Sequence, residues 1–244
     1  MIVTIDRPEV RNAVDFATAK ALREAVVRFE LDESVAVAVL TGAGGYFSSG
    51  FDLKALAEAP EGTINQDSPG PMGPTRIVHN KPVIAAIEGY AVAGGLELAL
   101  WCDLRVASRQ AVLGVFNRRF GVPLLDMGTI RLPRLIGQGR ALDLILTGRP
   151  VTAEEALRIG LVERVVEPGE ALAAAHKLAL EIAAFPQAAL RGDRMSVIFQ
   201  WGADEEEAVD SEIKYGLNAI RTGEARQGAR RFMEGKGRHG DKLS

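Results

Sequence analysis

Two glycine-bearing stretches, FSSGFDL at Phe47–Leu53 and GYAVAGGLELA at Gly89–Ala99, decide how this sequence folds. Each follows a short apolar run typical of a buried strand, Val35–Leu40 before the first and Val83–Ile87 before the second. The second stretch leads directly into a segment with the composition of a helix. Backbone N–H groups at a glycine turn or a helix N-terminus are unpaired, so they attract negative charge.

The two turns together suggest a reaction site. Two backbone donors that converge on one point form an oxyanion hole, which stabilises a carbonyl oxygen that gains charge during a reaction. Glu97 lies three residues after Gly94, about one helical turn further on, where its carboxylate is placed for acid–base chemistry. The alternative is that these glycines only make turns. The presence of both turns, with Glu97 in place, favours a site.

The order of motifs along the chain resembles the crotonase superfamily, the enoyl-CoA hydratase/isomerase family. The likeness runs from the N-terminus to about residue 162. Besides the two glycine-bearing stretches it includes DRPEVRNA at 6–13, LTGAG at 40–44, KPVIAA at 81–86, CDLRVAS at 102–108, RLPRLIG at 131–137, LTGR at 146–149 and GLV at 160–162.

This resemblance implies an α/β fold with two parts. Residues 1–185 are expected to form the crotonase-type spiral of ββα repeats, and residues 186–244 a helical C-terminal region that builds a trimer interface. In the family such trimers often pair into hexamers. The alternation of strands and helices alone does not distinguish this spiral from a doubly wound sheet.

Periodicity supports several individual elements. Asp15 is expected to cap a helix that runs to about Leu31, because apolar residues recur there at helical spacing. A proline-rich and glycine-rich loop is expected at Pro60–Pro74, where four prolines and three glycines leave no apolar period, and a loop of this length is often a lid. Further helices are predicted at Gln138–Leu146, Thr152–Ile159, Gly169–Ala184 and Ala203–Ile220.

The resemblance also implies roles for individual residues. Phe51 and Gly94 match the two oxyanion-hole residues of the family, which donate backbone N–H groups to a thioester carbonyl. Glu97 matches the first of the two acids that hydratases use. The second acid would lie at Asn117, where this sequence departs from the pattern. An asparagine can orient water but cannot exchange a proton at neutral pH, which puts two-glutamate hydration in doubt.

Asp126 is a candidate replacement for that acid. It stands just before a Gly-Thr pair, and dienoyl-CoA isomerases carry an aspartate in a similar place. The alternative is a helix cap or a charge in a first helical turn. We therefore expect an acyl-CoA hydratase or lyase with Glu97 as principal acid–base and Asp126 assisting. An enoyl- or dienoyl-CoA isomerase, or an acyl-CoA binder that has lost turnover, are the alternatives.

Coenzyme A would enter as part of the substrate, so no separate cofactor is expected. Its phosphates favour basic side chains. Lys54, Arg11 and Lys236 are the candidates, and each has the alternative of being a solvated surface charge. The three histidines are scattered without metal-ligand spacing, so no metal is expected.

Composition agrees with a soluble, cytoplasmic enzyme. The chain has 244 residues, of which 47% are apolar and 25% charged, enough for a sizeable core. A formal charge of −3 argues against a partner with many negative charges, such as a nucleic acid or an anionic membrane. Apolar runs such as Val35–Leu40 are far too short to span a bilayer.

Overall fold

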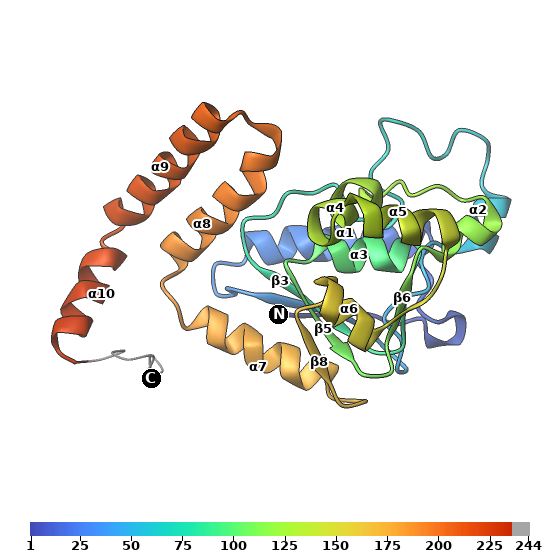
Figure 1. Ribbon diagram of the computed structural model, residues 1–244, viewed down its shortest axis with the longest axis horizontal. Helices are drawn as coiled ribbons and strands as arrows, with labels where there is room; N and C mark the ends of the chain where they lie inside the picture. Colours follow the sequence, from blue (N-terminus) through green and yellow to red (C-terminus); the bar gives the residue numbers. More distant parts are fainter. Residues whose placement is uncertain (236–244) are drawn as a thin grey trace. The chain divides into compact units, whose positions relative to one another are not determined.

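The computed structural model describes residues 1–235 and divides the chain into two compact units (Figure 1). Of the described residues, the first unit contains 1–79 and 83–179, and the second contains 80–82 and 180–235. The predicted boundary between residues 185 and 186 stays a prediction.

A five-stranded parallel sheet forms the centre of the first unit. Its strands are β1 (Ile2–Ile5), β2 (Ala38–Gly42), β3 (Val83–Ile87), β5 (Leu104–Ser108) and β8 (Arg164–Val166), and they lie side by side in the order in which the chain makes them. Every residue of β3 is buried, as expected for an uninterrupted apolar run in a parallel sheet.

A smaller second sheet joins β4 (Tyr90–Val92), β6 (Val112–Gly114) and β7 (Val151–Thr152). After β3 the chain enters this sheet as β4 and then forms helix α3 (Gly94–Trp101). Because the strand order of the main sheet never reverses, the sheet lacks the switch point of a doubly wound fold. The main sheet in chain order and the smaller second sheet agree with the predicted spiral of ββα repeats.

The predicted helix after Asp15 is also confirmed. Helix α1 spans Phe16–Leu31, and the Asp15 carboxylate accepts a hydrogen bond from the Thr18 amide at 2.8 Å. Its buried face includes Leu22, Val26 and Phe29. The other helices of this part of the chain are α2 (Leu53–Glu58), α4 (Gly128–Ile136), α5 (Gln138–Thr147), α6 (Ala153–Ile159) and α7 (Ala171–Ala183), with short 3-10 helices at Pro8–Val10 and Phe116–Phe120.

Two sequence expectations need correction. Strand β2 begins at Ala38 rather than Val35, so the first residues of the apolar run precede the sheet. Helix α4 was not among the predicted helices, since Pro133 lies inside it and interrupts the usual helical pattern. The Pro60–Pro74 segment has neither helix nor strand, in agreement with the predicted loop.

The second unit is helical. Helices α8 (Gln187–Phe199) and α9 (Glu205–Arg221) pack on each other, and α10 (Glu224–Met233) follows. The amide of Ala188 donates to the Glu224 carboxylate at 2.9 Å, which ties the start of α8 to the start of α10. Large apolar side chains of this unit remain exposed in the single chain, among them Val197, Phe199, Trp201, Ile213, Leu217 and Ile220. Among residues 1–235 no helix is long and apolar enough to cross a membrane.

Candidate active site

A backbone bridge joins the two glycine-bearing stretches. The Ser48 amide donates to the Tyr90 carbonyl at 2.8 Å, and the Ser48 carbonyl accepts from the Val92 amide at 3.1 Å. Gly95 must be glycine here, because a Cβ atom would lie 2.2 Å from the Ser48 oxygen. The two turns predicted from the sequence therefore lie side by side.

The Phe51 amide faces away from its neighbouring segment. Val14 bridges to Phe51 by donating to the Gly50 carbonyl at 2.8 Å and accepting from the Asp52 amide at 2.9 Å. In a parallel bridge of this pattern, the residue between the two bonded groups turns its own N–H to the other side. Within residues 1–235 the Phe51 amide donates to no acceptor.

The second donor, the Gly94 amide, is the first of helix α3 and has no partner inside the helix. Gly50 lies directly against it, since a Cβ atom on Gly50 would be 2.8 Å from the Gly94 nitrogen. Gly50 also has φ +100°, which strongly favours glycine. Ala93, which precedes the helix, has φ +53°, a conformation that costs a non-glycine residue roughly 1–3 kcal/mol and is typical of functional sites.

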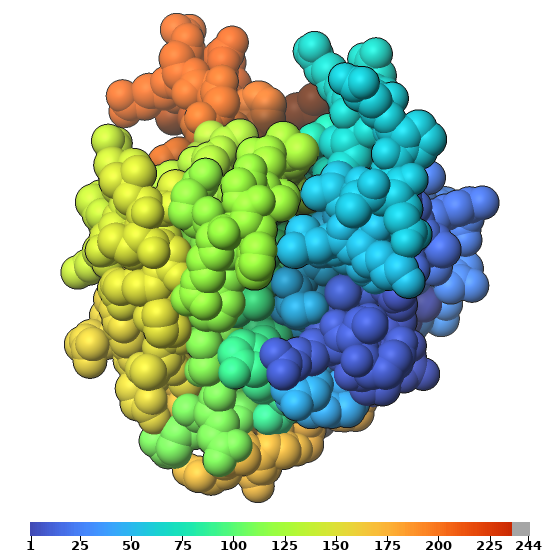
Figure 2. All heavy atoms as spheres, turned by 90° about the vertical axis from the view of Figure 1, so that its right-hand side faces the viewer, coloured from blue at the N-terminus to red at the C-terminus, as the bar shows by residue number. Residues whose placement is uncertain are grey.

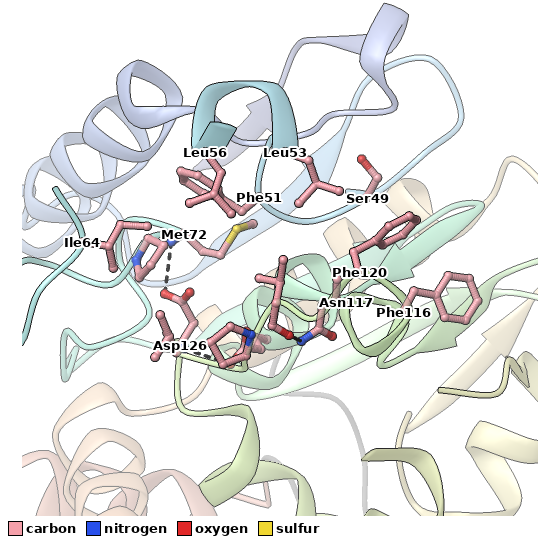
Figure 3. Close-up of a pocket in the computed structure, with 17 residues that line it drawn as sticks. Ser49, Phe51, Leu53, Leu56, Ile64, Met72, Phe116, Asn117, Phe120 and Asp126 are labelled. Atoms are coloured by element: carbon pink, nitrogen blue, oxygen red, sulfur yellow. Dashed lines mark hydrogen bonds between the residues drawn. The ribbon is translucent and has the colours of Figure 1, made fainter. Parts of the chain in front are cut away.

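Both donors line one cavity of about 290 Å³ (Figure 3). Figure 2 shows the face on which the segment containing residues 50–75, in blue to cyan, lies beside the green segment that follows residue 110. Most of the lining is apolar. The polar side chains in it are Ser49, Glu97, Asn117 and Asp126, and the apolar ones include Phe51, Leu53, Leu56, Ile64, Met72, Phe116, Phe120, Val122 and Leu125.

Glu97 is held by one of its two carboxylate oxygens. Oε1 accepts hydrogen bonds from the amides of Asp126 at 2.9 Å and Gly128 at 2.8 Å. The two amides converge on it because Met127, between them, adopts a left-handed conformation with φ +69°. In the described part of the chain Oε2 accepts no hydrogen bond. Glu97 therefore has one oxygen fixed and the other free to exchange a proton in the cavity.

The surroundings of Glu97 suit proton exchange near neutral pH. Burial raises the pKa of Glu97 to about 7, and the charge of Asp126 contributes in the same direction. The amides of Gly128 and Asp126 and the charge of Arg131 oppose this rise. A carboxyl group with a pKa near the working pH can both take and give a proton.

Asp126, like Glu97, is held by only one of its two carboxylate oxygens. Its Oδ1 accepts from the Met72 amide at 3.1 Å and from the Thr75 hydroxyl, whereas Oδ2 accepts no hydrogen bond among the described residues (Figure 3). Burial raises the pKa of this carboxyl, while the bonds to Thr75 and Met72 oppose the rise. The side chain does not cap helix α4, whose N-cap is Met127. Asp126 and Glu97 both line the cavity.

Asn117 is buried at the edge of the cavity. Its Nδ2 donates to the Val122 carbonyl at 2.8 Å, which fixes the orientation of the amide. Its Oδ1 is fully buried and has no hydrogen-bond partner in the described structure. An unsatisfied buried acceptor costs about 1–3 kcal/mol, so a bound O–H or N–H donor would relieve that cost.

Two of the predicted coenzyme A residues, Arg11 and Lys54, lie outside the cavity lining. Arg11 is exposed, with its guanidinium over the rings of Tyr46 and Tyr90 at 6.0 and 5.6 Å, and its carbonyl accepts from the amide of Ser49, a lining residue. Lys54 is exposed on the first turn of α2, next to the lining residue Leu53. Lys236 lies outside the described residues.

Sequence reasoning missed the contribution of the Pro60–Pro74 loop and the residue after it. Met72 is fully buried and packs on Gly94, because a Cβ atom on Gly94 would lie 2.6 Å from the Met72 sulfur. Thr75, also fully buried, anchors the same segment to Asp126. No apolar period marks these positions, so the sequence pattern held no signal for them. Within the described residues no three His, Cys, Asp or Glu side chains are grouped to hold a metal ion.

Comparison with known proteins identifies the family. The family profile described as enoyl-CoA hydratase/isomerase matches residues 1–240. The enoyl-CoA hydratase EchA19 of Mycobacterium tuberculosis is 36% identical over 241 residues, which cover 96% of this chain and 90% of that protein. A carnitinyl-CoA dehydratase of Salmonella arizonae is 42% identical over 182 residues, 74% of this chain and 69% of the relative.

Solved structures show the same fold. The crystal structure of enoyl-CoA hydratase EchA1 from Mycobacterium marinum superposes with a TM-score of 0.89 at 37% identity, over 96% of this chain and 91% of that one. The chain belongs to the enoyl-CoA hydratase/isomerase family, the crotonase superfamily, as its motifs predicted. It is an acyl-CoA-processing enzyme of the enoyl-CoA hydratase type.

Proposed function

We propose that the protein adds water across the double bond of an enoyl-CoA thioester, and removes it in the reverse direction. The observation that carries this proposal is the free Oε2 of Glu97 in a cavity lined also by Phe51 and Gly94, whose amides have no acceptor among residues 1–235. A carboxyl group able to exchange a proton beside two unpaired amides is what the reaction of a thioester enolate requires.

The two amides would bind the thioester oxygen. As water adds to the β-carbon, negative charge moves through the double bond onto this oxygen, and the Phe51 and Gly94 amides stabilise it. One such donor is typically worth about 3–4 kcal/mol in the transition state. The mostly apolar lining of the cavity favours an apolar acyl group.

Glu97 and Asp126 would share the proton transfers. The ionised Asp126 takes a proton from the attacking water, and protonated Glu97 gives its proton to the α-carbon, so the pair holds one proton before and after the reaction. Asn117 also lines the cavity and would orient the water. Asn117 itself exchanges no proton.

Double-bond isomerisation is the second candidate. The observation that favours it is that both carboxyl groups line the cavity and each has one free oxygen. The same pair could then move a proton between two carbons of the acyl chain without adding water. An acyl-CoA binder without turnover is the third candidate, since the amides of Phe51 and Gly94 need no proton transfer to hold a thioester.

A panel of enoyl-, hydroxyacyl- and dienoyl-CoA thioesters distinguishes these functions. We expect enoyl-CoA to gain the mass of one water, and the corresponding hydroxyacyl-CoA to lose it. A product of unchanged mass with a moved double bond would establish the isomerase instead. Calorimetric binding without turnover of any thioester would support the binder, and absence of binding would remove the whole functional proposal.

The pH dependence of turnover is the second prediction. If the Glu97–Asp126 pair works with a single proton, kcat/KM should rise at acid pH as the doubly protonated pair loses a proton. It should then fall as Glu97 loses the last proton, near its pKa of about 7. A rate that rises through this pH and stays high would mean that Glu97 acts alone as a base. Asp126→Asn is the control, because it should remove the bell shape.

Assembly, location and coenzyme A recognition are also part of the proposal. We infer a homotrimer or hexamer, supported by the exposed apolar side chains of α8 and α9, since patches of this kind are typical of protein interfaces. A cytoplasmic location fits the absence of a membrane-spanning helix among residues 1–235. Lys54, Arg11 and Lys236 are proposed to contact the phosphates of coenzyme A.

A further inference from the structure

Arg131 connects two segments that meet at the cavity but has no part in the proton transfers described above. It lies on the first turns of α4, half-buried, and its guanidinium donates to two backbone carbonyls. Nη2 donates to the backbone carbonyl oxygen of Thr75 at 2.7 Å, and Nη1 donates to the backbone carbonyl oxygen of Asp126 at 3.2 Å. The planar fork of an arginine suits such a double contact, which a lysine cannot reproduce.

One of these segments positions Glu97. The turn from Asp126 to Gly128 supplies both amides that hold Oε1 of Glu97. Met127 at its centre has a left-handed conformation, which other contacts must maintain. The bond from Arg131 to the Asp126 carbonyl fixes the beginning of this turn.

The other segment covers the oxyanion hole. Thr75 is bound from both sides, by Arg131 at its carbonyl and by Asp126 at its hydroxyl. The same Asp126 oxygen binds the Met72 amide, and Met72 packs on Gly94. Gly70, in the same loop, packs closely on the Asp126 carboxylate, since a Cβ atom at this position would lie 2.5 Å from it.

The guanidinium is also the nearby positive charge that acts on both carboxyl groups. Burial disfavours the charged form of Arg131, the carboxylates of Glu97 and Asp126 favour it, and the charge of Arg134 opposes it. Arg131 in turn favours the ionised forms of Glu97 and Asp126, and Arg76 does the same for Asp126. The hydrogen bonds of Arg131 and its charge therefore both act on the Glu97–Asp126 pair.

We propose that Arg131 is a positioning residue, which holds the Asp126–Gly128 turn under Glu97 and the Met72–Thr75 segment over Gly94. This inference rests on the proposed function. Arg131 contacts neither the substrate nor a transferred proton, but it determines the position of Glu97 and the pH range in which Glu97 is active.

The test uses Arg131→Met, which removes the charge and both hydrogen bonds. The descending limb of the pH profile should move upward by roughly one pH unit, the size of shift that loss of a nearby opposite charge produces. Arg134→Met is the matched control, since it removes the same charge from an exposed position on the same helix. A descending limb that stays at the wild-type pH in Arg131→Met would overturn the electrostatic part.

Arg131→Lys separates position from charge and is the safer variant if Arg131→Met fails to fold. It should keep the descending limb in place and lower kcat/KM by roughly 10-fold to 100-fold, as small misplacements of catalytic groups do. Wild-type kcat/KM in this variant would overturn the positioning role.

A readout without turnover keeps this test separate from the proposed function. Because the pKa of Glu97 is raised by folding, stability is lost as pH rises through about 7, and Arg131→Met should move that loss to higher pH. Absence of this shift in the pH dependence of thermal unfolding would count against the role of Arg131. If the shift occurs but wild type turns over no thioester, only the proposed function fails.

Discussion

Glu97→Gln is expected to lower kcat by about 10²–10⁴-fold, the usual loss when a general acid–base is removed. Glutamine keeps the shape and can still accept the amides of Asp126 and Gly128 through its oxygen, while its NH₂ group replaces the free Oε2. Binding of acyl-CoA should change little, because the amides of Phe51 and Gly94 are untouched. Steady-state kinetics and calorimetry of both proteins measure the two quantities.

The same substitution should stabilise the protein at alkaline pH. The pKa of Glu97 is raised from 4.5 to about 7, so its contribution to stability is present below the unfolded value and is lost as pH rises through 7. Glu97→Gln avoids this loss, which at pH above 7 corresponds to an upper limit of roughly 3 kcal/mol in the free energy of unfolding. Glu24→Gln, at an exposed position of α1, is the control and should change neither activity nor stability. Unchanged turnover of Glu97→Gln would exclude Glu97 as the acid–base.

Gly50→Ala should lower kcat by about 10²–10³-fold, the loss typical of one oxyanion-hole donor. Its Cβ atom would lie 2.8 Å from the Gly94 nitrogen, so the Phe51 and Gly94 segments must move apart. Both donors belong to the main chain and cannot be deleted directly, and this glycine is the contact that sets their spacing. Steady-state kinetics on an enoyl-CoA would measure the loss.

Gly169→Ala is the matched control for backbone strain. Gly169 also has positive φ, at +85°, but no atom lies within 4 Å of the position a Cβ would take. Both variants should therefore lose stability from the strained backbone, whereas only Gly50→Ala should lose activity in its folded fraction. Full activity of folded Gly50→Ala would show that the spacing of the two amides does not limit the reaction.

The parts of the site predicted from sequence are those that local chemistry determines. The turns at Gly50 and Gly94 follow strands, and Glu97 lies one helical turn from Gly94, so their proximity needs only the pairing of Ser48 with Ala91. The cap at Asp15 likewise depends on neighbours three residues apart. The strand order, by contrast, required the resemblance to the family, because alternating elements also fit a doubly wound sheet.

Contacts distant in sequence could not be predicted. Asp126 lies 51 residues from Thr75, and the bond between them depends on how the Pro60–Pro74 loop returns to the sheet. That loop has no periodicity, so neither Met72 over Gly94 nor the anchoring of Asp126 was visible. The asparagine at position 117 was visible in the sequence. Only the structure shows that its Nδ2 donates to the Val122 carbonyl and that its Oδ1 has no hydrogen-bond partner among the described residues.

The most direct test of the account is the reaction of an enoyl-CoA with the wild-type protein in D₂O, followed by mass spectrometry and NMR of the product. Addition of water through the Glu97–Asp126 pair should place one deuterium on the α-carbon and a hydroxyl group on the β-carbon. Glu97→Gln should form this product at least about 100-fold more slowly. Recovery of unlabelled enoyl-CoA from a wild-type protein that demonstrably binds it would contradict the account, because the oxyanion hole would then hold a thioester that no acid–base can reach.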